Sequence, residues 1–278
     1  MAGGLMQLVA YGAQDVYLTG NPQITLFKVV YRRHTNFSME CIELPIDTAK
    51  PSGRVSVQIL RNGDLATKSY LRVQLPTLQP TNAYSGSCAW VKRLGHAMIA
   101  NAEVQIGGAP IDKHWGHWLD VWYELTHTLD QERGYKNMIG DIPELTTLQT
   151  TVLGNGINLF IPFQFWFCTN YGLALPLIAL QYHEVRLNIT FQDIRNLIVY
   201  TKGTSNAAPT FGALTFSASV LVDYIYLDSD ERRRFAQAGH EYLIEQLQYN
   251  GNNLQNVQLG SANQQLTLNF NHPCKELI

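Results

Sequence analysis

The residues best placed to carry out chemistry are two histidines, His114 and His117, in the sequence HWGH. Residues three apart share one face of a helix, so these two imidazoles could bind a single metal ion. A metal site needs a third ligand and usually an acidic neighbour, and the sequence contains no second motif that supplies them. The spacing also differs from the HxH motif of cupin-type enzymes. We therefore interpret both histidines as surface residues of a helix.

Other residues with catalytic potential do not form recognisable motifs. No serine lies in GxSxG, and neither GxxxxGK[ST] nor GxGxxG occurs. Aspartates that could act in acid–base chemistry stand singly, at Asp15, Asp112, Asp120 and Asp193. The cysteines lie far apart without CxxC spacing, at Cys41, Cys88, Cys168 and Cys274. The sequence therefore predicts no catalytic residue, no cofactor and no metal site, and it predicts free thiols in a reducing compartment.

Two basic clusters could bind an anionic partner, such as a phosphate or an acidic membrane surface. They are Arg32-Arg33-His34 and Arg232-Arg233-Arg234. Both fall in segments expected to be helical, and the second follows Asp228, Asp230 and Glu231. Local ion pairs are therefore the favoured interpretation.

Two sequons for N-glycosylation occur, at Asn36 and Asn188. Asn188 falls on the polar face of a predicted strand and could be exposed. The first residues lack the basic segment of a secretory signal, so secretion and glycosylation are not expected.

The composition is unusual in its charge. Of 278 residues 46% are hydrophobic but only 15% are charged, against about 25% in ordinary domains. The net charge of −2 argues against a general nucleic-acid binder. Residues 145–183 and 246–271 contain no Asp, Glu, Lys or Arg. Prolines interrupt the first run and half of the second is Asn or Gln, so neither is expected to span a membrane.

Alternating apolar residues predict an all-β domain. The clearest segment is Val185–Gln192, in which Val185, Leu187, Ile189 and Phe191 share one face. Similar alternation occurs in Arg54–Arg61, Ser69–Leu75, Ile157–Cys168 and Phe216–Tyr226. Asn62-Gly63-Asp64 and Gly107-Gly108 predict turns. At least seven short strands in one unit indicate a β-sandwich or jelly roll.

Three segments have helical periodicity instead. The first begins at Asn21-Pro22, the second covers His114–His127, and the third covers Asp228–Ala238. The second carries a stripe of Trp115, Trp118, Leu119 and Trp122. We expect a strand-dominated domain with helices in its loops.

Several long motifs closely resemble the major capsid proteins of nucleocytoplasmic large DNA viruses. They are GGLMQLVAYGAQDVYLTGNPQITLFKVVYRRHTNFSME at the start, LRNGDLATKSYLRVQLP (Leu60–Pro76), IGGAPIDKHWGHWLDVWYELT (Ile106–Thr126), LPLIALQYHEVRLNITF (Leu175–Phe191), LDSDERRRFAQAGHEYLIEQLQ (Leu227–Gln248) and HPCKELI (His272–Ile278). These motifs stand in the order of the family and extend over nearly the whole chain.

The resemblance implies two eight-stranded antiparallel jelly rolls in tandem and a structural rather than enzymatic function. Three copies would form a trimeric capsomer of pseudo-hexagonal outline, and capsomers would tile an icosahedral shell. It places the protein in the virion, assembled in the cytoplasm of an infected cell. Implied partners are the other copies of a homotrimer, neighbouring capsomers, minor capsid proteins and an internal viral membrane, but no specific nucleic acid.

The resemblance also divides the chain. Residues 1–20 would form an N-terminal arm facing inward, and residues 21–227 the first jelly roll, with helical loop insertions after Ile111 and in Met138–Thr150. Residues 228–240 would form a helical linker, and residues 241–278 the first strands of an incomplete second jelly roll. Family members are longer, so we expect a truncated or split form, with 241–278 disordered or docked on the first domain.

Two other functions remain as alternatives. A carbohydrate-binding jelly roll would use exposed tryptophans as stacking platforms, with Trp90, Trp115 and Trp118 as candidates. A metal-dependent jelly-roll enzyme would use His114 and His117. Burial of the tryptophans would argue against the first, and a purified protein found by elemental analysis to contain no metal would argue against the second.

Overall fold

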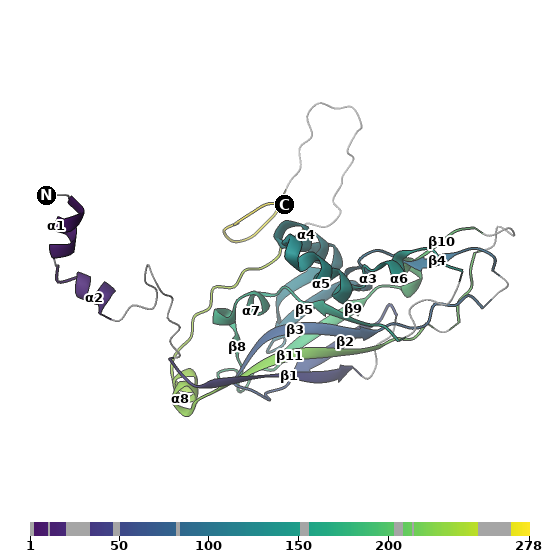
Figure 1. Ribbon diagram of the computed structural model, residues 1–278. Coiled ribbons are helices and arrows are strands. Elements are labelled where there is room, and N and C mark those ends of the chain that lie inside the picture. Colours follow the sequence, from purple (N-terminus) through teal and green to yellow (C-terminus); the bar gives the residue numbers. More distant parts are fainter. Residues whose placement is uncertain are drawn as a thin grey trace.

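Two antiparallel sheets face each other in the computed structural model (Figure 1). The structure describes residues 3–10, 12–20, 34–46, 51–81, 84–150, 156–202, 208–212, 214–249 and 268–278. The first sheet has the order β1 (Phe37–Ile46), β11 (Ser217–Leu227), β3 (Leu65–Gln74) and β7 (Asn158–Pro162), and β8 (Leu175–Pro176) also pairs with β3. The second has the order β2 (Arg54–Ile59), β9 (Val185–Phe191), β5 (Ile99–Ile106) and β6 (Ala109–Trp115). A separate small sheet joins β10 (Ile198–Tyr200) to β4 (Cys88–Trp90).

The strands pair in a nested order. The first strand pairs with the last, so that Phe37 on β1 lies opposite Leu227 on β11. Within this pair, β2 pairs with β9, β3 with β7, and β5 with β6. The contacts of β11 with β3 and of β9 with β5 then complete the two sheets. Strands distant in sequence are thereby brought together around one core.

Alternating apolar residues from both sheets fill the space between them. Val55, Val57 and Ile59 on β2 are buried, as are Leu71 and Val73 on β3. All belong to one contiguous hydrophobic cluster. The strands predicted at Arg54–Arg61, Ser69–Leu75, Val185–Gln192 and Phe216–Tyr226 are confirmed as β2, β3, β9 and β11, with each end within four residues of its predicted position.

The long strand predicted at Ile157–Cys168 is wrong in its second half. The strand β7 ends at Pro162, and residues Trp166–Thr169 form the short helix α7. Proline has no N–H to donate to a further ladder bond, which favours an end there. Phe163, Phe165 and Phe167 are still buried, because each points into the core from irregular or helical backbone.

Helices occupy the loops between strands. A group beside the sandwich comprises α3 (Leu94–Met98), α4 (Gly116–Thr126), α5 (Leu129–Ile139) and α6 (Pro143–Thr146). The 3₁₀ turns η1 (Tyr171–Leu173) and η2 (Ile194–Leu197) lie in later loops. The helix predicted from His114 begins at Gly116, because His114 and Trp115 still belong to β6. Gly140 ends α5 in the left-handed conformation, with φ of 80°.

The segments at either end are less regular. The predicted N-terminal arm, residues 1–20, contains two short helices, α1 (Gly3–Val9) and α2 (Asp15–Thr19). The helix predicted from Asn21-Pro22 lies outside the described residues. The predicted helix at Asp228–Ala238 is confirmed as α8 (Ser229–Gln237).

After α8 the chain runs in extended form along the side of the sandwich towards α4 (Figure 1). The resemblance predicts the first strands of a second jelly roll within residues 241–278. Residues 241–249 and 268–278 contain no helix or strand, and residues 250–267 lie outside the described residues. In the part of the chain that the structure describes, no helix has the length and hydropathy needed to cross a membrane.

Candidate functional site

The two histidines of the HWGH sequence lie on different elements. His114 belongs to the end of β6, where its side chain is buried and its ring stacks on Phe165 at a centroid distance of 4.5 Å. Its Nε2 lies 2.9 Å from Asp112 Oδ2, an ion-pair contact. His117 lies on α4 and is exposed. The interpretation of both as surface residues of one helix is therefore wrong for His114.

This separation removes the reason for considering a shared metal ion. Among the described residues, no group of three or more His, Cys, Asp or Glu side chains is arranged to hold one. The buried His114 instead contributes to packing between β6 and the phenylalanines of the core.

The three tryptophans considered for carbohydrate stacking have different environments. Trp90 on β4 is only 1% exposed and belongs to the core, so its ring is closed to a sugar. Trp115 is half-buried and contacts the ring of Tyr249 at 5.0 Å. Trp118 is half-buried beside Trp122, at 5.7 Å. They do not form one exposed aromatic platform.

Two arginines of the second basic cluster make ion pairs, and only the pair of Arg233 with Asp230 is local in sequence, as predicted. The Arg232 Nε atom lies 3.2 Å from Asp64 Oδ1, and Arg233 lies 3.8 Å from Asp230. Asp64 belongs to the predicted Asn62-Gly63-Asp64 turn, which joins β2 to β3, so the arginine connects α8 to the sandwich. Of the first cluster, Arg32 and Arg33 lie outside the described residues.

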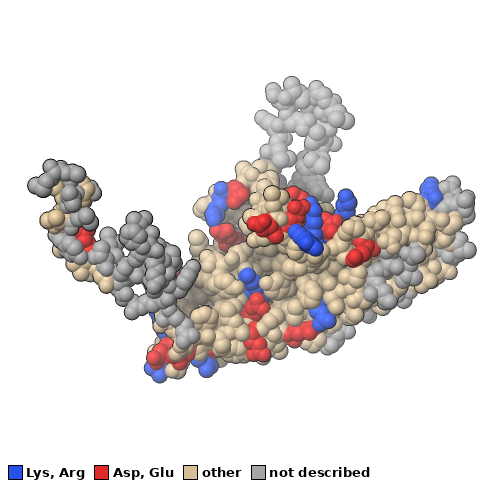
Figure 2. Space-filling view, viewed as in Figure 1, with Lys and Arg blue, Asp and Glu red and all other residues tan. Residues whose placement is uncertain are grey.

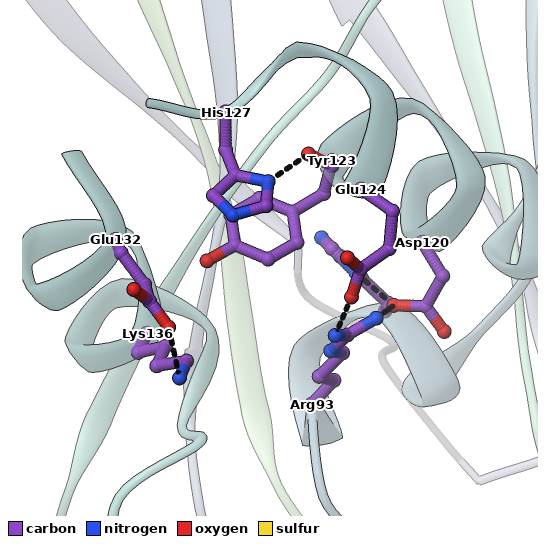
Figure 3. A network of polar contacts seen from close by, with 8 residues as sticks. Arg93, Asp120, Tyr123, Glu124, His127, Glu132 and Lys136 are labelled. Carbon is purple, nitrogen blue, oxygen red and sulfur yellow. Dashed lines mark hydrogen bonds and ion pairs between the residues drawn. The ribbon is translucent and has the colours of Figure 1, made fainter. Parts of the chain in front are cut away.

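A network of polar contacts joins the helices beside the sandwich (Figure 3). Arg93, just before α3, contacts Glu124 and lies 3.8 Å from Asp120, both on α4. Tyr123 on α4 stacks on His127 at 4.4 Å, and the His127 ring bonds the Tyr123 carbonyl oxygen. Lys136 pairs with Glu132 along α5 at 2.5 Å. This network therefore ties α4 to the start of α3, with a further pair along α5.

His96 lies at the centre of these helices. Its side chain is completely buried, with Nδ1 2.5 Å from Asp120 Oδ1 and Nε2 2.8 Å from Tyr135 Oη. Burial raises the pKa of Tyr135 above its ordinary value of 10.0. A His–Asp pair can act as a general base, but here the second nitrogen bonds a tyrosine and the imidazole itself is fully buried. We assign His96 a structural role, because it connects α3, α4 and α5.

The cysteines form no disulfide bonds. All four cysteines are free. Cys168 and Cys88 are buried, and burial raises the pKa of Cys168 to about 12.

The asparagines of the two sequons differ in exposure. Asn36 is exposed, whereas Asn188 on the central strand β9 is only 5% exposed. The suggestion that Asn188 could be exposed is wrong, although Arg186 on the same face of β9 is exposed.

Charges are unevenly distributed over the surface. In Figure 2, Lys, Arg, Asp and Glu gather over α4 and α5, whereas the end at β4 and β10 is largely uncharged. A hollow of about 400 Å³ lies between the end of β2 and the start of β9, with Arg61, Gln181 and Tyr182 in its lining. Another of about 310 Å³ is lined by Asp228, Asp230 and Glu231 with residues 34–36. Neither holds a group of side chains arranged for catalysis.

Two family models match the chain in succession. Residues 25–228 match the model described as "Major capsid protein N-terminus", and residues 231–278 match "Large eukaryotic DNA virus major capsid protein". The two matches meet at α8. The chain is also 52% identical to the major capsid protein of Pyramimonas orientalis virus, covering 100% of this chain and 65% of that protein.

Other relatives give the same result. Over 99% of its length the chain is 32% identical to the probable capsid protein 4 of Acanthamoeba polyphaga mimivirus, 71% of which is covered. Capsid protein 1 of the same virus is 48% identical, with 100% of this chain and 48% of that protein covered. Five relatives, all 44–52% identical to the chain, are covered over 48–65% of their own length. The chain thus spans about half to two thirds of these proteins.

Solved structures share the fold. The chain of the PBCV-1 virus capsid is 37% identical, with a TM-score of 0.65 over 81% of this chain and 50% of that one. The Faustovirus major capsid protein matches in fold, with 12% identity and a TM-score of 0.60 over 81% of this chain and 60% of that one. The resemblance inferred from the sequence motifs is thereby confirmed. The chain belongs to the major capsid protein family of large eukaryotic DNA viruses.

Proposed function

We propose that this chain is a structural shell protein whose copies form trimeric capsomers of pseudo-hexagonal outline that tile an icosahedral capsid. The observation that carries this proposal is the pair of consecutive capsid matches over residues 25–228 and 231–278. The 37% identity to a chain of a virus capsid supports it. The place of action is the virion, after assembly in the cytoplasm of an infected cell.

The strand pairing supports a jelly roll for the first unit, residues 21–227. In a sandwich of this kind the chain folds as a ribbon of nested antiparallel pairs. Eight strands form such nested pairs here: β1 with β11, β2 with β9, β3 with β7, and β5 with β6. We assign these eight to the first jelly roll, with β4, β8 and β10 as additions in its loops. Residues 228–240 would be the linker, and residues 241–278 the start of a second jelly roll.

The uncharged surface suits self-association. The strand β4 lies at this end of the sandwich, and the sequence that leads into it, residues 76–90, contains no charged residue. Burying unpaired charge between copies is costly, whereas amides and hydroxyls can satisfy one another across an interface. Val199 and Tyr200 on β10 are 46% and 45% exposed, so apolar area is also available for burial there.

The other partners follow from the same proposal. Neighbouring capsomers would contact the sides of the trimer. The N-terminal arm, residues 1–20, would contact minor capsid proteins or the internal membrane. Val9 and Tyr17 in this arm are 82% and 89% exposed, and apolar groups so placed favour a covering partner.

The test is the mass of the purified chain in solution, measured by light scattering over a range of concentrations. We expect a species of three times 31.3 kDa, with a three-lobed outline in negative-stain electron microscopy. A monomer at every concentration would contradict the proposal that this chain forms trimers.

A glycan array tests the carbohydrate-binding alternative, for which we expect no binding because Trp90 is buried.

A further inference from the structure

The strand β6 ends one sheet, and a later segment of the chain lies against it. In the order β2-β9-β5-β6, β6 has a paired neighbour on one side only among the described strands. Such an edge presents backbone N–H and C=O groups that can pair with another copy of the chain. For a protein that reaches high local concentration during assembly, an open edge is a hazard.

Residues 244–249, which we name the strap, contact this edge at three points. Gln246 Nε2 donates a hydrogen bond of 2.5 Å to the Ile111 carbonyl oxygen. The Leu247 N–H donates one of 3.1 Å to Asp112 Oδ1. The ring of Tyr249 packs on Trp115. Ile111, Asp112 and Trp115 all belong to β6, so the strap follows the strand.

Asp112 is the central contact because its charge is buried. Its side chain is only 1% exposed, and a carboxylate removed from water needs hydrogen bonds or an opposite charge. The Lys113 N–H bonds the same Oδ1 at 2.9 Å, and His114 Nε2 lies 2.9 Å from Oδ2. The Leu247 N–H adds a second hydrogen bond to Oδ1 from outside the sandwich, whereas Oδ2 has no hydrogen-bond partner among the described residues.

The strap covers the edge without extending the sheet. Residues 241–249 contain no strand, and each of the three contacts has a side chain on at least one side, so none of them is a backbone-to-backbone bond of a ladder. A segment that paired by its backbone would itself present a new open edge. A segment held by side chains does not.

The strap also holds a later segment. Gln248 Nε2 donates to the Asn271 carbonyl oxygen at 2.6 Å, and the Asn271 N–H returns a bond of 2.9 Å to Gln248 Oε1. Lys275 pairs with Glu245. Residues 268–278 therefore connect to β6 through the strap.

We propose that the strap is an edge guard: held by the buried Asp112 carboxylate, it covers β6 and prevents copies from pairing through that edge. This proposal depends on the proposed self-assembly in one respect: copies of the chain must meet at high concentration. It can fail while trimers still form.

The primary test uses Leu247→Pro in the full chain. Proline removes the N–H that bonds Asp112 and leaves β6 unaltered. Leu243→Pro is the matched control, because it places proline in the same extended segment at a side chain that is 79% exposed. Two quantities are measured: the rate of proteolytic cleavage within 238–249, and the mass distribution at rising concentration, with hydrogen exchange of the β6 amides in each species.

We expect Leu247→Pro to be cleaved at least about tenfold faster than the wild type, as the loss of a hydrogen bond to a charged group predicts. It should also form larger species in which the β6 amides are protected, while Leu243→Pro behaves as the wild type. Cleavage at the wild-type rate overturns Asp112 as the holding residue. Faster cleavage without the additional association overturns the guard.

A second variant, Asp112→Ala, removes the same hydrogen bond without placing a proline in the strap, so it shows whether the effects of Leu247→Pro come from the lost bond. It should release the strap in the same way. Asp193→Ala is its control, because Asp193 also accepts a backbone N–H, from Arg195 at 3.0 Å, in a loop distant in sequence from β6. If Asp112→Ala does not fold, Leu247→Pro still decides the question.

Discussion

Asp64 and Arg232 join the turn between β2 and β3 to the helix that follows the last strand. The Arg232 Nε lies 3.2 Å from Asp64 Oδ1, while Asp64 Oδ2 accepts the Leu227 N–H at 2.7 Å. The Asp64 side chain is 9% exposed and that of Arg232 is 60% exposed. One carboxylate therefore fixes both the end of β11 and the direction of α8.

We predict that Asp64→Ala lowers the free energy of unfolding by about 1–3 kcal/mol, because it leaves the Leu227 N–H without its acceptor. Arg232→Ala should cost less than about 1 kcal/mol, since exposed ion pairs contribute little. Denaturant titration measures both. Arg233→Ala is the control, with no change expected. Equal losses for Asp64→Ala and Arg232→Ala would contradict this division.

The buried bond between His96 and Tyr135 gives a second prediction. Tyr135→Phe removes the hydroxyl group that lies 2.8 Å from His96 Nε2, so a buried ring nitrogen loses its partner. We expect a loss of about 1–3 kcal/mol in unfolding free energy. Tyr182→Phe makes the same chemical change at a side chain that is 93% exposed and should have no effect beyond about 0.5 kcal/mol. Similar results for the two variants would show that the His96 contacts do not stabilise the helices.

Glu43 connects three neighbouring strands and predicts a dependence of stability on pH. The Ser219 hydroxyl donates to Glu43 Oε1 at 2.6 Å and Arg72 lies 2.9 Å away. The Ser219 hydrogen bond, with the charge of Arg72, lowers the pKa of Glu43 below its ordinary value of 4.5. A carboxylate with a lowered folded-state pKa adds stability above its unfolded pKa and loses it as pH falls through the folded value.

Glu43→Gln should therefore be less stable than the wild type at pH 7, and the difference should shrink as the pH falls below 4.5. Thermal unfolding at a series of pH values measures it. A difference that stays constant down to pH 3 would contradict the assignment. Glu144→Gln, on the exposed first turn of α6, serves as the control.

Substitution by alanine should change the stability of the protein in opposite directions at two glycines, Gly116 and Gly134. A Cβ at Gly116 would lie 2.4 Å from the carbonyl oxygens of His96 and Ile99, so Gly116→Ala should cost at least about 1–3 kcal/mol. A Cβ at Gly134, inside α5, would have no atom within 4 Å. Gly134→Ala should instead stabilise by about 0.5–1 kcal/mol. Calorimetry measures the unfolding free energy of both variants. A Gly116→Ala variant as stable as the wild type would contradict the close approach of α4 to α3.

The sequence predicted those parts of the fold in which local pattern and tertiary environment agree. Val185–Gln192 alternates because β9 is central and its apolar face meets the opposite sheet. Asp228, the first residue of the predicted helical segment, is the N-cap of α8, because capping is a local effect. In β1 only Leu44 is fully buried, so an edge strand with a mostly exposed face produced no alternation strong enough to predict it.

The candidate site residues were harder to predict because their environment is set by distant elements. Nothing near His114 in sequence indicates that β6 ends there or that Phe165 lies against its ring. The pairing of Asp112 with Leu247 joins residues 135 positions apart. His96 had no motif at all, since its partners Asp120 and Tyr135 come from two later helices.

The nested strand pairing has a consequence for the order of events during synthesis. The partner of β1 is β11, so the residue opposite Phe37 is Leu227. A ribosome must add every intervening strand before β1 can form its ladder, and until then β1 and β3 both lack their shared neighbour. Pairings so distant in sequence are slow to form. Nascent chains that stop before Ser217 should therefore depend on chaperones, whereas chains that have passed Leu227 should close the sandwich without them.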